Sequence, residues 1–134
     1  MKEKCDAGSE IVITQLFYNN EIYLQWVKDC KAAGIKAHFI PGIMPILGYE
    51  RFGKTVKYCK TNVPAHLSEA LEPLKNDDEK VRKFGVDYCV RQSQELIDAG
   101  TKFLHYYTMN LETAVIQTIQ GLGILKTRKE HPFP

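Results

Sequence analysis

The sequence has no pair of cysteines at the C-x-x-C spacing that is typical of zinc sites and redox motifs. Its 4 cysteines are spread along the chain, at positions 5, 30, 59 and 89. The 4 histidines add no closely spaced ligands, so we expect no metal site. Without a secretory signal, free thiols that pack as small apolar side chains are favoured over a disulfide framework.

Long apolar runs and charge of one sign are also missing. No segment approaches the roughly 20 apolar residues that span a membrane, and residues 1–8 lack the apolar core of a secretory signal. The 18 basic and 16 acidic residues are interspersed, which gives a net charge of +2 without a basic stripe. We therefore expect a cytoplasmic protein that binds neither a membrane nor nucleic acid.

The sequence does have a run of β-branched and aromatic residues at positions 11–18, which predicts a strand buried on both faces. Gln15 is the exception in this run. It shares a face of the strand with Ile11 and Ile13, because side chains alternate along a strand. A buried carboxamide at this position must find hydrogen bonds or cost about 1–3 kcal/mol.

Apolar periodicity, capping residues and glycine stops predict the other elements. We expect helices over residues 2–7, 21–33, 49–60, 64–72 and 112–120, a longest helix capped within 76–79 and ending at 99, and strands over 37–40 and 103–108. Asn19 or Asn20 can cap the second helix, and Asn110 or Thr108 the last one. Pro41 is expected to close the second strand, because proline has no N–H for the ladder.

The segment 42–48, which follows this strand, is apolar. Loops are usually polar, so one interpretation is that the segment faces the top of a barrel or a bound ligand. The other interpretation is that it packs over its own domain.

One helix-to-strand connection, called the Ala-Gly joint below, occurs three times. An Ala-Gly pair at residues 7–8, 33–34 and 99–100 stands between a predicted helix and a predicted strand. The β-then-α order makes the fold class α/β, with parallel strands and right-handed crossovers. An open three-stranded sheet would need protected edges, which these strands lack. We therefore expect about three βα units of a TIM-type (β/α)8 barrel, in which ligand groups lie at the carboxyl ends of the strands.

Four segments carry a resemblance to a known family. They are Asp6-Ala7-Gly8 with Ile13-Thr14-Gln15-Leu16-Phe17; Ile40-Pro41-Gly42-Ile43-Met44-Pro45-Ile46 with Gly48-Tyr49; Glu72-Pro73-Leu74-Lys75-Asn76-Asp77-Asp78; and Leu104-His105-Tyr106-Tyr107-Thr108-Met109-Asn110. In this order they resemble the catalytic domain of methylenetetrahydrofolate reductases, a flavin-binding (β/α)8 barrel. The resemblance implies that residues 1–134 form the C-terminal part of that barrel. The polar segment 126–134, which ends in Pro-Phe-Pro, is expected to be a tail or the start of a linker.

The resemblance implies an oxidoreductase of one-carbon folate metabolism. NAD(P)H would reduce FAD, and the flavin would then pass a hydride to 5,10-methylenetetrahydrofolate, giving 5-methyltetrahydrofolate. It also implies that the complete protein is a homo-oligomer and that the N-terminal part of the barrel is a partner of this chain. The residues do not distinguish NADH from NADPH.

The resemblance assigns substrate contacts to Gln15, Tyr49 and Tyr107, and cofactor contacts to Lys4 and Gln15. Gln15 would hydrogen-bond the pterin and, in its turn, the nicotinamide, because an amide donates and accepts without carrying a charge. Tyr49 would stack beside the aminobenzoyl ring, and Tyr107 would line the substrate pocket. Lys4 would lie near the FAD phosphates.

Each of these residues also has a purely structural interpretation. Gln15 could be a paired core amide, and Tyr49 could be the packed start of a helix. Tyr107 could fill the barrel interior, and Lys4 could be a solvated cation at a helix end.

Two departures from the family pattern matter. Many members carry an arginine directly after the Thr-x-Asn segment and use it on the substrate, whereas this chain has Leu111. The family's catalytic glutamate and its Arg-Gly-Asp-type flavin contacts belong to earlier strands, so no catalytic residue is assigned here. We expect an incomplete barrel that alone binds FAD weakly and lacks reductase activity. The alternative is a standalone, non-catalytic α/β binding or assembly module.

Overall fold

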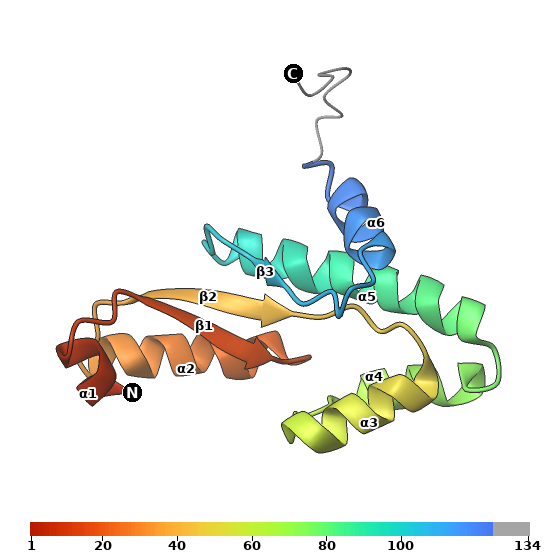
Figure 1. The fold of residues 1–134 in the computed structure, drawn as a ribbon, viewed down its shortest axis with the longest axis horizontal. Coiled ribbons are helices and arrows are strands. Elements are labelled where there is room, and N and C mark those ends of the chain that lie inside the picture. The colour runs from red at the N-terminus through yellow and green to blue at the C-terminus, as the bar shows by residue number, and fades with distance from the viewer. Residues whose placement is uncertain (125–134) are drawn as a thin grey trace.

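A computed structural model describes residues 1–124 of the protein, and the predicted tail at 126–134 lies outside the described residues. The elements in chain order are α1 (Lys2–Asp6), β1 (Ile11–Leu16), α2 (Asn20–Ala32), β2 (His38–Ile43), α3 (Tyr49–Cys59), α4 (Ala65–Leu71), the 3₁₀ turn η1 (Glu72–Leu74), α5 (Asp78–Asp98), β3 (His105–Tyr106) and α6 (Thr113–Gly121). The strands form one sheet in the order β1-β2-β3, and both pairs are parallel. The predicted α/β class with parallel strands is confirmed (Figure 1).

The repeated Ala-Gly joint has one backbone conformation at all three places. Gly8, Gly34 and Gly100 have φ values of 111°, 79° and 91°, a region that costs glycine little. At each joint the glycine N–H bonds a carbonyl three residues back, and the following N–H bonds one five residues back. These paired bonds end α1, α2 and α5 in the same way and direct the chain into the next strand or its lead-in.

The strand boundaries differ from prediction. β2 does not close at Pro41 but continues to Ile43. The register explains this, because β1 carries an irregularity between Ile13 and Leu16, so that Ile40 pairs with Ile13 while Gly42 pairs with Leu16. Pro41 lies opposite the irregularity, where its missing N–H removes no regular ladder bond.

The outer strands are shorter than predicted. β1 ends at Leu16 instead of residue 18, and β3 covers only His105 and Tyr106 instead of 103–108. Within the described residues β3 has a single neighbour, β2, and Phe103 is 63% exposed. The aromatic residues of this segment therefore predicted a longer strand than the structure has.

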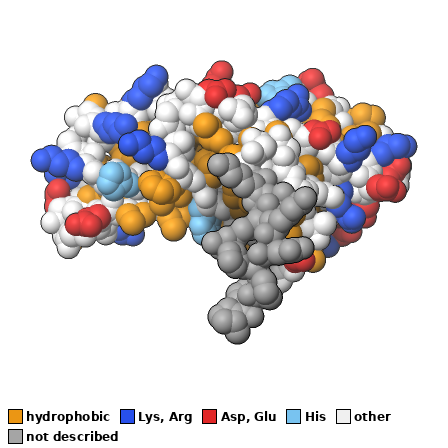
Figure 2. Space-filling model, turned by 90° about the horizontal axis from the view of Figure 1, so that it is seen from above, with side chains coloured by type: hydrophobic (Ala, Val, Ile, Leu, Met, Phe, Trp, Pro, Cys, Tyr) orange, Lys and Arg blue, Asp and Glu red, His pale blue; other side chains and the backbone are white. Residues whose placement is uncertain are grey.

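Within residues 1–124, helices cover one face of the sheet and leave the other open. The rings of Trp26 on α2 and Phe39 on β2 lie 5.1 Å apart, edge to face, and Tyr23 and Leu96 pack with Ile43 of β2. Figure 1 shows α2 below β1 and β2, and Figure 2 shows hydrophobic side chains gathered on the surface seen from above.

The prediction that β1 is buried on both faces is wrong. Ile11 and Ile13, which face away from the helices, are 60% and 49% exposed. No described residue covers this face, so these two side chains remain open to solvent.

The apolar segment after β2 packs against its own domain. Met44 and Ile46 are 6% and 2% exposed, and Ile46 contacts α5 at Gly85. A β-carbon on Gly85 would lie 2.0 Å from the Ile46 carbonyl oxygen, so only glycine permits this approach. The second interpretation of this segment is therefore correct for Met44 and Ile46.

Two of the three predicted helix caps are confirmed. Asn19 accepts hydrogen bonds from the N–H groups of the first turn of α2, and Asp77 caps α5 by accepting from Lys80 N. The prediction for α6 is wrong, because Glu112 is its N-cap residue and makes no side-chain bond. Residues 109 and 110 instead form the centre of a tight turn closed by a hydrogen bond from Leu111 N to Thr108 O.

Candidate functional site

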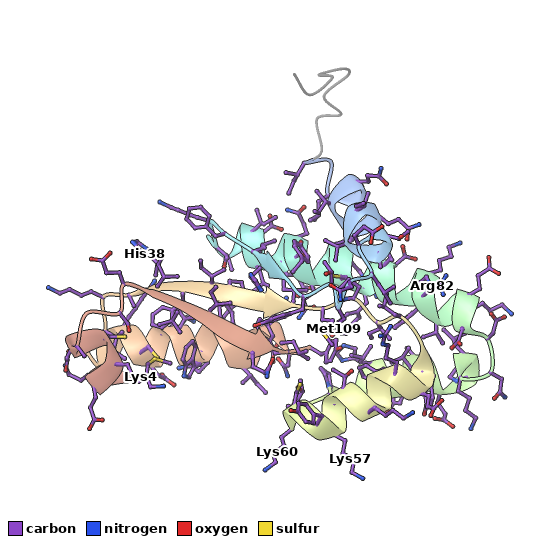
Figure 3. All side chains as sticks on the ribbon, in the orientation of Figure 1. Lys4, His38, Lys57, Lys60, Arg82 and Met109 are labelled. Carbon is purple, nitrogen blue, oxygen red and sulfur yellow. The ribbon has the colours of Figure 1, made fainter. Side chains whose placement is uncertain are left out.

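The carboxyl ends of the three strands meet at one edge of the sheet, where the segments 17–20, 44–48 and 107–112 follow them. In parallel α/β folds this edge is where ligands bind. Figure 3 shows Met109 and Arg82 at this side of the molecule, whereas Lys4 and His38 lie at the opposite end of the sheet.

Side chains from other elements hold the end of β1 in place. The Tyr107 hydroxyl donates to the Thr14 carbonyl oxygen at 3.0 Å. Beyond the end of the strand, Tyr88 donates to Tyr18 O at 2.6 Å and Gln92 Nε2 donates to Phe17 O at 2.9 Å. These side chains, one from the segment after β3 and two from α5, satisfy backbone carbonyls at the end of β1 that have no partner in the sheet.

Gly42 allows the segment after β3 to reach β1 across the intervening strand. Its N–H donates to Thr14 Oγ1 at 2.9 Å. A β-carbon at this position would lie 2.4 Å from Thr14 O and 2.7 Å from Tyr107 Cε2. The missing side chain therefore lets the Tyr107 ring lie over β2 with its hydroxyl on β1.

Gln15 is exposed, so the interpretation as a paired core amide does not hold. Its Oε1 accepts a hydrogen bond from the next backbone N–H, that of Leu16, at 3.0 Å. Its amide nitrogen forms no hydrogen bond within residues 1–124 and remains available as a donor. The predicted ligand contact of Gln15 stays a prediction.

The structure brings Gln15 and Tyr107 together at the end of β1. Tyr107 bonds the carbonyl of Thr14, the residue before Gln15, and its ring lies 4.6 Å from that of His105 in an edge-on arrangement. Tyr107 also packs against a buried cluster that includes Leu16. It therefore has a structural role in this edge of the sheet, and its place in a substrate pocket stays a prediction.

Tyr49 begins α3 and packs against the same buried cluster as Tyr107. Its hydroxyl donates to Glu72 Oε2 at 2.5 Å, and Glu72 also accepts a hydrogen bond from Lys75. Lys75 and then Tyr49 lower the pKa of the Glu72 carboxyl, and the bond to Glu72 raises the pKa of Tyr49. Tyr49 thus faces η1 with its hydroxyl already bonded, and only its ring is left for a stacking contact.

Lys4 does not join the other three residues. It is exposed on α1, which precedes β1, and so lies at the amino end of the sheet (Figure 3). It forms no ion pair with any residue between 1 and 124. Its contact with FAD phosphates stays a prediction.

Sequence reasoning missed a small cavity at the carboxyl edge. The cavity has a volume of about 280 Å³. Its lining comes from the loop after β2, α3, α5 and the start of α6: Leu47, Arg51, Arg82, Leu111, Thr113 and Ala114. A helix that follows a parallel strand begins at the carboxyl edge, which gave a signal for Arg51 on α3. It gave none for Arg82, because α5 follows η1.

Within residues 1–124, no group of three or more His, Cys, Asp or Glu side chains is placed to hold a metal ion. Over the same residues, none of the helices combines the length and the apolar character that crossing a membrane requires.

These features define a class of protein. The chain is a parallel α/β protein whose helices cover one face of the sheet and whose polar groups collect at the carboxyl ends of the strands, as in part of a (β/α)8 barrel. A sequence model of the family described as methylenetetrahydrofolate reductase matches residues 1–123. The chain belongs to the methylenetetrahydrofolate reductase family.

Individual relatives agree with this assignment. The chain is 42% identical over 135 residues to a probable methylenetetrahydrofolate reductase (NADPH) of Caenorhabditis elegans, covering 100% of the chain and 20% of the relative. It is 39% identical over 129 residues to methylenetetrahydrofolate reductase (NADH) 1 of Arabidopsis thaliana, covering 96% and 22%. It is 34% identical over 124 residues to the 5,10-methylenetetrahydrofolate reductase of Salmonella typhimurium, covering 92% and 42%. The chain thus spans about a fifth of the length of the first two relatives.

Proposed function

We propose that this chain supplies the C-terminal βα units of an FAD-dependent barrel that reduces 5,10-methylenetetrahydrofolate to 5-methyltetrahydrofolate with NAD(P)H. The observation that carries the proposal is the family match over residues 1–123. The names of the relatives include both NADPH and NADH, so the proposal covers either reductant.

The residues at the carboxyl edge suit this function. Gln15 presents an unbonded amide nitrogen on the face of β1 that no described residue covers, so it can donate to a ring carbonyl of a pterin or a nicotinamide. Tyr107 fixes the adjoining backbone through its bond to Thr14, which limits the positions that Gln15 can adopt. Tyr49 offers the face of its ring for stacking on an aromatic part of the substrate.

The cofactor contacts within this chain are few. FAD, when bound, would supply the hydride. Gln15 is the residue placed to contact a flat ring at the carboxyl edge, and Lys4 offers an unpaired ammonium group to an anion at the other end of the sheet. Because these are two separate contacts, we propose that FAD binds tightly only when further strands surround the sheet.

A chimeric enzyme tests the proposal. In the C. elegans relative, the segment that aligns with this chain would be replaced by residues 1–134 of this chain, and methylenetetrahydrofolate reduction would be measured. We expect an active FAD enzyme, in which Gln15→Ala lowers kcat/KM for the folate about ten- to a hundredfold, the effect of losing one or two buried hydrogen bonds. Gln25→Ala is the matched control, because this exposed amide on α2 bonds only Asp29 of its own helix. A folded chimera that binds FAD and reduces no folate would overturn the proposal.

The chain by itself provides a second test. We propose that it shows no flavin binding at micromolar FAD and no reductase activity. Quenching of FAD fluorescence with a stoichiometry near one would contradict this part of the proposal. Such a result, together with a compact monomer, would favour a standalone binding module.

A further inference from the structure

The cavity at the carboxyl edge combines two cations with an apolar lining. Arg51 projects into it from the first turn of α3, and Arg82 from the beginning of α5. Leu47, Leu111 and Ala114 supply apolar surface to the lining of the same cavity.

Neither arginine is neutralised within the described chain. The ion pairs among residues 1–124 all involve lysines and lie within single helices or turns. Among the carboxylates at the helix starts, Glu50 pairs with Lys54 and Asp77 pairs with Lys80, whereas Asp78, Glu79 and Glu112 pair with neither arginine. Two guanidinium groups from separate elements thus face one cavity without a described counter-ion, which favours an anionic ligand.

We propose that this cavity binds the glutamyl tail of the folate substrate, with Arg51 and Arg82 each taking one carboxylate. This inference rests on the proposed function and makes it more specific. A glutamyl group has two carboxylates joined by an aliphatic chain, which suits a cavity lined by two guanidinium groups and two leucine side chains. The arginines then compensate within this chain for the neutral side chain of Leu111.

A phosphate of a cofactor is the other anion available at such an edge. Phosphate sites in α/β folds are typically made by glycine-rich loops whose N–H groups surround the anion. The loop after β3 has no glycine between residues 107 and 112, and its tight turn uses Leu111 N for an internal bond. The apolar lining likewise fits a carbon chain better than a compact, hydrated phosphate.

Ligand binding by the wild-type chain tests the inference without requiring catalysis. The ligand is N-(4-aminobenzoyl)-L-glutamate, which carries the tail and lacks the pterin, and binding is followed by ligand-observed saturation-transfer NMR, which tolerates association of the protein. We expect saturable binding that is at least about tenfold weaker in the Arg51→Gln/Arg82→Gln double variant, since each charged hydrogen-bonded pair contributes a few-fold. Lys83→Gln is the matched control, because it removes one charge from the residue beside Arg82 without lining the cavity.

Two further ligands identify what the cavity recognises. 4-Aminobenzamide, which has the ring without carboxylates, should bind at least about tenfold more weakly than the glutamate conjugate. Inorganic phosphate should displace the conjugate only at a much higher concentration. The inference is wrong if the conjugate does not bind, if the double variant binds it as well as the wild type does, or if phosphate competes equally.

These outcomes are separable from those of the proposed function. An active chimera together with a chain whose arginines do not affect conjugate binding would reject the tail site alone. An inactive chimera together with arginine-dependent binding of the conjugate would reject the reductase activity and retain the anion site.

Discussion

At the scale of single residues, two glycines in helices have opposite expected effects. Gly85 lies in the buried face of α5, where a β-carbon would meet the Ile46 carbonyl oxygen at 2.0 Å. Gly53 lies on the exposed side of α3, with nothing within 4 Å of an added β-carbon. We expect Gly85→Ala to lower the free energy of unfolding by at least about 2 kcal/mol, because α5 and the loop after β2 must separate.

Gly53→Ala is the control for this effect. Alanine has the higher helix propensity, so the substitution should raise the free energy of unfolding by about 0.5–1 kcal/mol. Urea denaturation followed by circular dichroism measures both variants. Equal effects of the two substitutions would show that the contact between Gly85 and Ile46 does not form.

The thiol of Cys89 should make the protein sensitive to alkali. Burial raises its pKa from 9.0 to about 12, although Thr118 and Ser93 partly oppose the shift. Above pH 9 the unfolded chain loses this proton while the folded chain keeps it, so stability falls as pH rises toward 12. Between pH 9 and 10 the unfolding equilibrium constant should rise about fivefold through this group.

Cys89→Ala removes this contribution. The variant should be less stable at pH 7 because of the lost side chain, but its stability should decrease less between pH 9 and 10. Tyrosines such as Tyr23, whose pKa burial raises from 10.0 to about 12, begin to contribute as pH approaches 10, but they do so equally in the variant and the wild type. Urea titrations at pH 7, 9 and 10 under reducing conditions measure the difference. Identical slopes in the variant and the wild type would contradict the assignment to Cys89.

Sequence reasoning at the residue scale succeeded where a local rule decides the outcome. The cap of α2 was predicted as Asn19 or Asn20 and that of α5 within residues 76–79, because short polar side chains bond free N–H groups close in sequence, and the structure has Asn19 and Asp77 there. Gln92 was not singled out, although it is 4% exposed and bonds Phe17 O. Its partner is 75 residues away along the chain, and no local pattern identifies such a pair.

At the scale of elements, the start of α2 depends on one side chain. Asn19 Oδ1 accepts hydrogen bonds from Glu21 N at 3.0 Å and Ile22 N at 3.3 Å. We expect Asn19→Ala to lower the free energy of unfolding by about 1 kcal/mol, because these N–H groups lose their partner. Asn76→Ala is the matched control, since Asn76 is exposed and makes no side-chain hydrogen bond within the described chain. Thermal unfolding of both variants should show a lowered midpoint for Asn19→Ala only.

The elements themselves were predictable to different degrees. The three Ala-Gly joints gave the order of helices and strands, since a left-handed glycine after a helix is a local feature. The length of β3 was not predictable from its aromatic residues, because a strand extends only as far as its neighbour pairs with it. The cap of α6 was missed because Asn110, with φ at 62°, is used inside the turn that precedes the helix.

At the scale of the whole molecule, the sheet formed by residues 1–124 is covered by helices on one face and has unpaired edge strands. Within residues 1–124, β1 has a single neighbour, and the face of the sheet away from α2 has no cover. The candidate site was predictable to the extent that parallel strands bring their carboxyl ends together. The arginine cavity was not predictable in this way, because it needs the relative positions of α3, α5 and the start of α6.

The uncovered face should make the isolated chain associate. Ile11 and Ile13 present apolar surface beside the unpaired edge of β1, and both surface and edge gain by pairing with another chain. We expect the Ile11→Thr/Ile13→Thr double variant to associate at least about tenfold more weakly, because threonine keeps the β-branched shape and removes apolar area. Ile116→Thr on α6 is the control, since Ile116 is also exposed, at 43%, but lies away from the sheet face.

Size-exclusion chromatography with light scattering, over a range of concentrations, distinguishes the two variants. If the sheet face drives association, only the double variant shifts the wild-type distribution toward the monomer, and both variants retain the far-UV circular dichroism of the wild type. If any loss of exposed apolar surface is enough, Ile116→Thr shifts the distribution equally. A wild-type chain that is monomeric at all concentrations and melts cooperatively would show that the sheet is stable with one face exposed. The inference that the sheet needs further strands around it would then be wrong.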